Sequence, residues 1–252
     1  MAGVIFDQAG NLFGTTYDGG DSFYCCGVAY EVSPAGGGTW TYNVVHTFGQ
    51  PGDGTSPRAP LVLDNAGNLY GTTTEGGSSN QGTVFQMTPS ASGWNENILW
   101  SFLASPDGTY PLGSLVLDAT GNVYGATYEG GTSGNCGPHG CGTIFAVSPA
   151  NGGWTETVLH SFDLSNGDGW PEGGLTMDAA GNLYGTTYRN LGSVFKLTPT
   201  NGGWVYTTLH EFQYSDGVNP ISAVAIDADG NLYGTTSGGG AYSYGVVWEI
   251  TP

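Results

Sequence analysis

A ten-residue motif, Asp-x-x-Gly-Asn-(Leu/Val)-(Tyr/Phe)-Gly-(Thr/Ala)-Thr, occurs five times in this chain of 252 residues. In each copy a turn containing Gly-Asn separates a short apolar run from an aromatic run, which is typical of two antiparallel strands joined by a tight turn. Self-similarity at a period of about fifty residues indicates a tandem-repeat protein. Successive copies are 57, 54, 60 and 49 residues apart and begin at Asp7, Asp64, Asp118, Asp178 and Asp227.

Two more kinds of strand-like run follow the motifs. One begins at Gly and ends at Pro, as in residues 82–89, and occurs five times; the other runs from Trp to Phe, as in residues 94–102, and occurs four times. Four short strands per repeat predict the blades of a β-propeller. We therefore expect one all-β domain over residues 1–252, a five-bladed β-propeller closed around a narrow axis. Its antiparallel blades should have four strands each, with three in the last, over residues of approximately 1–56, 57–111, 112–171, 172–220 and 221–252.

The patterning also predicts where each strand lies in its blade. The first run is apolar at nearly every position, so it is expected beside the axis and covered on both faces, whereas the Trp-to-Phe run alternates and is expected at the outer edge. A glycine recurs in the second strand of every repeat. Because glycine weakens a strand, we expect a neighbouring blade to approach closely at these positions. They are Gly14, Gly71, Gly125, Gly185 and Gly234.

The charge balance excludes some partners. Three Lys and Arg residues stand against 21 Asp and Glu residues, giving a net charge of −18. Such a chain repels phosphate backbones and anionic surfaces, so nucleic acid is not an expected partner. No apolar run approaches eighteen residues, and membrane insertion is not expected either. Four cysteines and few lysines favour an extracellular or cell-surface protein, with an export signal absent from these residues.

The cysteines fall into two pairs that are close in the sequence, and all four are disulfide candidates. Cys136 and Cys141 enclose a short loop with His139, which favours a disulfide and leaves a zinc site or free thiols as alternatives. Cys25 and Cys26 are neighbours in the chain. For them a vicinal disulfide, an inter-chain bridge and unpaired thiols all stay open.

Several polar residues recur at fixed positions in the repeats. The motif's Asp is expected to accept backbone N–H bonds within its own turn, with a calcium-binding role as the alternative. His46, His160 and His210 share one position of the Trp-to-Phe run, where the second repeat has Trp100. We expect these histidines to lie on separate blades and to serve packing, so the sequence predicts neither a metal site nor a catalytic residue.

The loops vary most between repeats and therefore hold the best candidate site. In a four-stranded blade, the loop between the second and third strands and the Asp-Gly connection between blades emerge on one face of the propeller. Aromatic rings beside carboxylates and amides suit the apolar faces and hydroxyls of sugars. The alternative is that the acidic turn residues are merely solvated. The candidate ligand-binding residues are Tyr17, Asp18, Tyr128, Glu129, Asp168, Trp170, Tyr188 and Arg189.

The order of the segments GNLYGTT, GG, GTVFxxTP, GGWxxxxLHxF and DGxxP resembles the GloVer tandem repeat of large secreted bacterial proteins, and the resemblance covers essentially the whole chain. It implies export and propeller-type repeats. It carries no defined catalytic residues, so none can be assigned by analogy.

The leading functional hypothesis is a non-catalytic recognition or adhesion module that binds a glycan or another cell-surface polymer at the loop face. No cofactor is expected, although calcium is possible. One alternative is a glycan-active hydrolase or lyase, which would need two carboxylates about 5–10 Å apart near the axis. The other is a structural unit that self-associates through an open blade edge.

Overall fold

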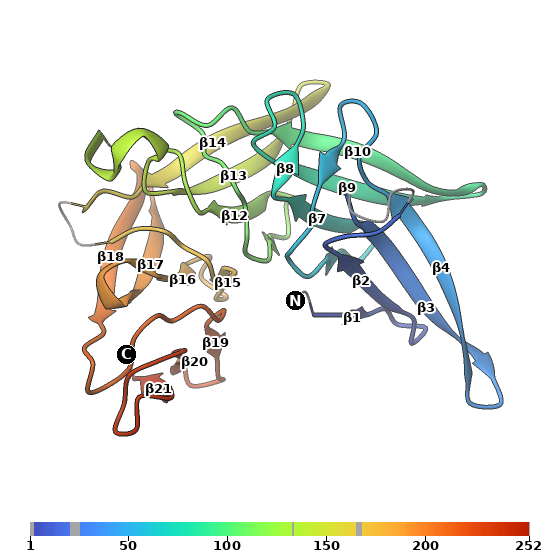
Figure 1. Ribbon diagram of the computed structural model, residues 1–252. Helices are drawn as coiled ribbons and strands as arrows, with labels where there is room; N and C mark the ends of the chain where they lie inside the picture. The colour runs from blue at the N-terminus through green and yellow to red at the C-terminus, as the bar shows by residue number, and fades with distance from the viewer. Residues whose placement is uncertain (1–2, 21–25, 133, 165–167, 252) are drawn as a thin grey trace.

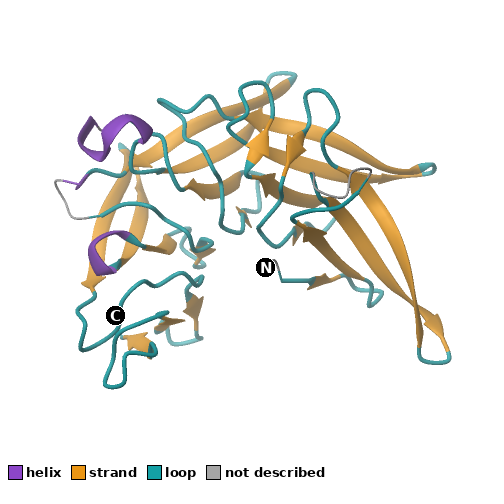
Figure 2. Ribbon diagram, viewed as in Figure 1, coloured by secondary structure: helices purple, strands orange, loops and turns teal. Residues whose placement is uncertain are grey.

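The computed structural model describes residues 3–20, 26–132, 134–164 and 168–251. These residues form five small antiparallel sheets that lie side by side around a common centre (Figures 1 and 2), a five-bladed β-propeller. The predicted strand number is confirmed, with four strands in each of the first four blades and three in the last. The predicted order within each blade is also confirmed, because hydrogen-bonded neighbours follow the chain from the innermost to the outermost strand.

The strands of the five blades have the following bounds. Blade 1 contains β1 (Ile5–Phe6), β2 (Leu12–Thr16), β3 (Val28–Gly36) and β4 (Thr39–Thr47); blade 2 contains β6 (Val62–Leu63), β7 (Leu69–Thr73), β9 (Thr83–Ser90) and β10 (Gly93–Ser101); blade 3 contains β11 (Val116–Leu117), β12 (Val123–Thr127), β13 (Thr143–Ala150) and β14 (Gly153–Ser161). Blade 4 contains β15 (Thr176–Met177), β16 (Leu183–Thr187), β17 (Ser193–Thr200) and β18 (Gly203–Glu211), and blade 5 contains β19 (Ala225–Ile226), β20 (Leu232–Thr235) and β21 (Val247–Ile250).

The remaining elements lie in the loops. β5 (Gly54–Thr55) pairs with β8 (Glu75–Gly76) in a separate two-stranded sheet. Two short 3₁₀ segments, η1 (Gly134–His139) and η3 (Arg189–Leu191), lie between the second and third strands of blades 3 and 4.

The hydrophobic core lies between the blades. Four apolar clusters fill the four interfaces between successive blades. In each cluster, the Phe that follows the outer strand of one blade meets an aromatic ring from the third strand of the next blade, with ring centroids 5.1–5.9 Å apart. The pairs are Phe48 with Phe85, Phe102 with Phe145, Phe162 with Phe195, and Phe212 with Trp248.

Blades 1 and 5, at the two ends of the chain, have more exposed apolar side chains than the inner blades on the faces that do not pack against blade 2 or blade 4. Val4 of blade 1 is 48% exposed, whereas its counterpart in blade 2, Leu61, is 1% exposed. Val247 of blade 5 is 79% exposed, whereas its counterpart in blade 2, Val84, is fully buried. Within the described ranges no apolar cluster joins blade 5 to blade 1, so the predicted closure of the ring is not made by a fifth interface of the same kind.

The recurring strand glycines make a close contact, but not the predicted one. A Cβ atom on Gly71 would lie 2.5 Å from Cζ of Phe85 and 2.8 Å from Cδ2 of Leu61. Both side chains belong to the same blade as Gly71, so the expectation of a neighbouring blade was wrong. The reason is strand register: Gly71 pairs directly with Phe85, whose ring covers the glycine.

The innermost strands are less covered than the sequence indicated. Leu61 is buried, but Val62 and Leu63 of β6 are only half-buried. The prediction that this strand is covered on both faces was therefore wrong for two of its three apolar positions. Its outer counterpart β10 shows the expected alternation of exposed and half-buried residues over most of its length.

Candidate functional site

The two sets of loops named by the sequence do share one face. β5, in the connection from blade 1 to blade 2, pairs with β8, which follows the second strand of blade 2. Thr109 bridges Glu129 in the same way between blades 2 and 3, and Val218 bridges Gly238 between blades 4 and 5. The loop face therefore consists of alternating connections and intrablade loops held together by backbone hydrogen bonds.

Three of the predicted site residues form one cluster on this face, which we call the aromatic cluster: Tyr128, Trp170 and Arg189. The rings of Tyr128 and Trp170 are stacked, with centroids 5.8 Å apart and an interplanar angle of 27°. The guanidinium carbon of Arg189 lies 4.3 Å from the centroid of the Trp170 ring, a cation–π contact. Its Nε atom is buried and has no hydrogen-bond partner. Tyr188 adjoins the cluster because its N–H donates to the carbonyl of Trp170 at 3.0 Å.

The connection between blades holds Trp170 in an unusual backbone conformation. Its φ is +57°, which costs a bulky residue more than it costs Asn or Gly. The corresponding residue before Pro has a similar φ in the other three connections, where it is Ser56, Tyr110 or Asn219. The backbone shape is thus a property of the repeat, and the choice of a Trp at this position is specific to blade 4.

A second stack lies toward the centre of the propeller. The guanidinium carbon of Arg58 lies 4.6 Å from the ring centroid of Tyr17, another predicted site residue. Arg58 and Glu172 line a pocket of about 400 Å³, whose other walls come from the segments that enter the innermost strands. Burial raises the pKa of Glu172, and the charge of Arg58 opposes this shift. Glu172 also acts electrostatically on Tyr128, whose pKa is raised mainly by burial, so the pocket adjoins the aromatic cluster.

The remaining predicted residues lie in different places. Glu129 lines a separate pocket of about 460 Å³ together with Tyr110 and His139, and its carboxylate is 3.8 Å from the His139 ring. Asp18 is exposed in the first loop, next to Tyr17. Asp168 is only 2% exposed and accepts hydrogen bonds from the hydroxyls of three side chains, so it lies beneath the loop face and not on it. Its partners are Ser193, Tyr206 and Thr208.

Sequence reasoning missed a polar contact at the blade interfaces. At two interfaces the His of the Trp-to-Phe run meets the Asp of the Asp-Gly connection that follows it: His46 Nε2 lies 3.0 Å from Asp53 Oδ2, and His210 Nε2 lies 3.0 Å from Asp216 Oδ2. His46 and Asp53 are seven positions apart. An Asp recurs in each of the four complete repeats and a His in three of them, which is the signal that could have paired them. The prediction that the histidines lie on separate blades is confirmed, but His46 and His210 have carboxylate partners in addition to their packing contacts.

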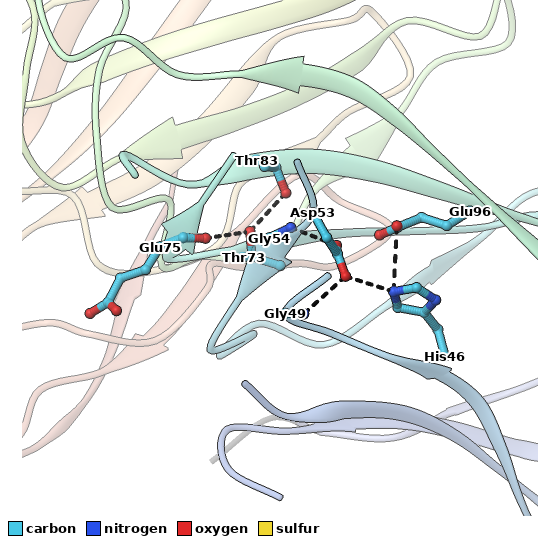
Figure 3. Close-up of polar contacts among 8 residues, drawn as sticks. All are labelled: His46, Gly49, Asp53, Gly54, Thr73, Glu75, Thr83 and Glu96. Carbon is cyan, nitrogen blue, oxygen red and sulfur yellow. Dashed lines mark hydrogen bonds and ion pairs between the residues drawn. The ribbon is translucent and has the colours of Figure 1, made fainter. Parts of the chain in front are cut away.

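The interface between blades 1 and 2 adds a third group to this pair. Glu96, on β10, places its Oε2 atom 3.4 Å from His46 Nε2 (Figure 3). Burial and the neighbouring charge of Asp53 raise the pKa of Glu96, although the charge of His46 opposes this. Burial lowers the pKa of His46, but its hydrogen bond to Asp53 and the charge of Glu96 outweigh that effect and raise it.

Two of the other blade interfaces have a different residue at the position of His46 or of Glu96. Between blades 2 and 3, Trp100 donates from Nε1 to Asp107 at 3.3 Å, and Glu156 takes the position of Glu96. Between blades 3 and 4, His160 stacks on Tyr206, with ring centroids 4.1 Å apart. Burial lowers the pKa of His160 to about 4, against the opposing charge of Asp168.

Glu156 predicts a pH dependence of stability. Burial, and to a smaller extent the charge of Asp107, raise the pKa of Glu156 to about 7. In an unfolded chain the pKa of a glutamate is about 4.3. Since the folded state favours the neutral acid, the stability that Glu156 contributes is present below about pH 4.3 and is lost as pH rises through about 7. In urea unfolding at pH 5 and pH 8, Glu156→Gln should therefore lose less stability between the two values than the parent protein. Glu211→Gln, at an exposed glutamate, is the control, and equal losses in parent and Glu156→Gln would contradict the prediction.

The motif's Asp has the structural role expected of it. Oδ1 of Asp178 accepts hydrogen bonds from the backbone N–H groups of Ala180 and Asn182 at 2.9 Å. Oδ2 accepts hydrogen bonds from the side-chain amide of Asn182 and the hydroxyl of Tyr184. These bonds lower the pKa of Asp178 against the effect of burial. The carboxylate oxygens are thus engaged within the turn.

Of the cysteine predictions, one is confirmed. Cys136 and Cys141 form a disulfide with their Cα atoms 5.3 Å apart, which rules out the zinc and free-thiol alternatives there. The prediction for Cys25 and Cys26 involves Cys25, which lies outside the described residues.

The repeats of this chain match a known protein family. The family model for the Gloeobacter/Verrucomicrobia repeat matches residues 1–189 and 131–252, which together span the chain. The protein belongs to this repeat family. The GloVer resemblance is thereby confirmed, and the family together with the Cys136–Cys141 disulfide is consistent with an extracellular protein.

The fold is also found in a solved structure. A crystal structure of a protein of unknown function from Dyadobacter fermentans matches with a TM-score of 0.54 at 12% identity, over 92% of this chain and 73% of that one. At this identity the match supports the fold alone. No curated protein matches the repeat protein significantly. Across its described residues, no helix has the length and apolar character needed to cross a bilayer.

Proposed function

We propose that this repeat protein is a non-catalytic recognition module that binds carbohydrate at the aromatic cluster of its loop face. The observation that carries the proposal is that two of the three cationic side chains in a chain of net charge −18 lie on this face, each stacked on an aromatic ring. The edges of the aromatic rings suit the apolar parts of a sugar, and the guanidinium groups and the carboxylate of Glu172 suit its hydroxyl groups.

The alternatives have less support. A hydrolase or lyase needs two carboxylates near the axis. The pocket beside the segments that enter the innermost strands has one carboxylate, Glu172, among the described residues that line it. Self-association remains a second candidate because Val4 and Val247 expose apolar surface on the end blades. Light scattering tests it, and a monodisperse monomer at all concentrations would count against it.

Replacement of Trp170 tests the carbohydrate proposal. Trp170→Asn removes the ring but keeps a residue that suits the positive φ, as Asn219 does in the next connection. We expect binding to immobilised polysaccharides to weaken at least about tenfold, because an aromatic anchor typically contributes about 2 kcal/mol or more. The measurement is depletion from solution over a panel of neutral and uronic acid polysaccharides.

The control variant is Tyr42→Ala, at a ring that is 56% exposed on the outer strand β4, outside the loop face, and should not affect binding. If the parent protein binds no polysaccharide in the panel, or if Trp170→Asn binds as tightly as the parent, the proposed site is wrong.

A further inference from the structure

We propose that His46, Asp53 and Glu96 bind a divalent transition-metal ion, zinc in the first place, at the interface between blades 1 and 2. This site is separate from the aromatic cluster and does not depend on the carbohydrate proposal. In the described part of the chain, it is the one group of three or more His, Cys, Asp and Glu side chains whose ligand atoms all lie within 4.8 Å of one another.

The distances between the ligand atoms suit a small ion. His46 Nε2 lies 3.0 Å from Asp53 Oδ2 and 3.4 Å from Glu96 Oε2, and the three side chains converge from two blades (Figure 3). Zinc bonds to imidazole nitrogen and carboxylate oxygen are about 2.0–2.2 Å long, so tetrahedral ligands lie about 3.3–3.6 Å apart. Small rotations of these side chains would bring the three ligands to that spacing.

Two ligands are already oriented by their surroundings. The carboxylate of Asp53 is 4% exposed and accepts the backbone N–H groups of Gly49, at 3.0 Å, and Gly54. Such outer hydrogen bonds orient metal ligands and raise their affinity. The His46 ring packs edge-on against Phe48, with centroids 4.9 Å apart.

Glu96 supplies an independent observation. Its Oε1 atom is buried and has no hydrogen-bond partner. An unpaired buried carboxylate oxygen is costly, and a cation held by both oxygens of Glu96 would remove that cost. The His46 side chain is 22% exposed, so an ion can reach the cluster from solvent and keep a water molecule as its fourth ligand.

The chemistry of the ligands selects the type of ion. An imidazole with two carboxylates suits zinc and neighbouring transition metals, whereas calcium prefers six to eight oxygen ligands. Two negative carboxylates and a neutral imidazole also balance a charge of +2. The calcium considered from the sequence would therefore bind here poorly.

Each of the other blade interfaces lacks one of the three ligands, so we expect one bound ion per chain. Trp100 replaces the histidine between blades 2 and 3, and Tyr206 replaces the glutamate between blades 3 and 4. His210 and Asp216 pair at 3.0 Å between blades 4 and 5. There the third position belongs to a fourth strand, which blade 5 lacks among its described residues. The chain therefore contains near-copies of the site that differ by one ligand.

Equilibrium dialysis of the untagged protein against zinc chloride, followed by metal analysis, tests the proposal. We expect about one zinc per chain in the parent protein and no comparable uptake of calcium. Glu96→Gln should weaken zinc binding at least about tenfold, since loss of even an outer-shell partner costs about 10–100-fold. Glu156→Gln is the matched control, because that interface lacks the imidazole, and it should bind zinc like the parent.

A gain of binding gives a second test. Trp100→His adds an imidazole beside Asp107 and Glu156 and so completes a second set of three ligands. We expect this variant to bind about two zinc ions per chain. When cobalt replaces zinc, its visible absorption bands should be about twice as intense in the variant as in the parent. Thermal unfolding of each variant would verify that it is folded. No zinc binding by the parent, unchanged affinity in Glu96→Gln, or a single zinc in folded Trp100→His would each overturn the assignment.

Discussion

Replacing Phe145 with alanine is expected to lower the free energy of unfolding by about 3–5 kcal/mol. Phe145 is fully buried on β13, between blades 2 and 3, where its ring meets that of Phe102 at 5.1 Å. The same ring also covers Gly125 on the paired strand, so its removal leaves a cavity bounded by two blades. Because each blade is held mainly by its neighbours, the loss should destabilise the whole propeller and not one hairpin. Urea unfolding followed by tryptophan fluorescence measures the change.

The control for this prediction is Tyr244→Ala. Tyr244 is 91% exposed, so its loss should alter the free energy of unfolding by no more than about 0.5 kcal/mol. A loss below about 1 kcal/mol for Phe145→Ala would contradict the view that the interblade clusters stabilise the fold.

The second large effect is expected from Gly125→Ala, which should destabilise the protein by about 1–3 kcal/mol. A Cβ atom at this position would lie 2.5 Å from Cζ of Phe145 and 2.8 Å from Cδ2 of Leu115. Both neighbours are buried core side chains that cannot move aside without disturbing the interface. The same substitution in an ordinary strand is favourable, because alanine restricts the unfolded chain. Thermal or urea unfolding distinguishes these outcomes.

Gly153→Ala is the matched control, since Gly153 also lies in a strand and a Cβ atom there would meet no heavy atom within 4 Å. It should be neutral or slightly stabilising. Equal effects of the two substitutions would show that the ring over Gly125 is not what requires glycine.

The order of strands, their number and the turns between them could be predicted because they depend on local chemistry. Each Asp-x-x-Gly-Asn turn satisfies its own polar groups: the carboxylate of Asp178 accepts hydrogen bonds from residues no more than six positions away. The disulfide of Cys136 and Cys141 closes a similarly short loop. The repeats then place equivalent elements at equivalent positions without knowledge of the rest of the fold.

The candidate site could be predicted only in part. The sequence placed Tyr128, Trp170 and Arg189 on one face, but their stacking depends on the relative rotation of blades 3 and 4. Asp168 shares the same connection, yet its carboxylate turns inward to three hydroxyl groups, one of which belongs to Tyr206, 38 residues away. Short-range pattern cannot reveal which way a loop carboxylate points.

Sequence alone therefore determined that this protein is a five-bladed propeller of antiparallel blades with one loop face, because periodicity and turn chemistry act within a single repeat. Only the tertiary structure decided which side chains meet: that Phe85 covers Gly71 within one blade, and that Glu96 joins His46 and Asp53 across two. Those contacts depend on strand register and on the packing of blades about their common centre, and neither is encoded in the spacing of residues along the chain.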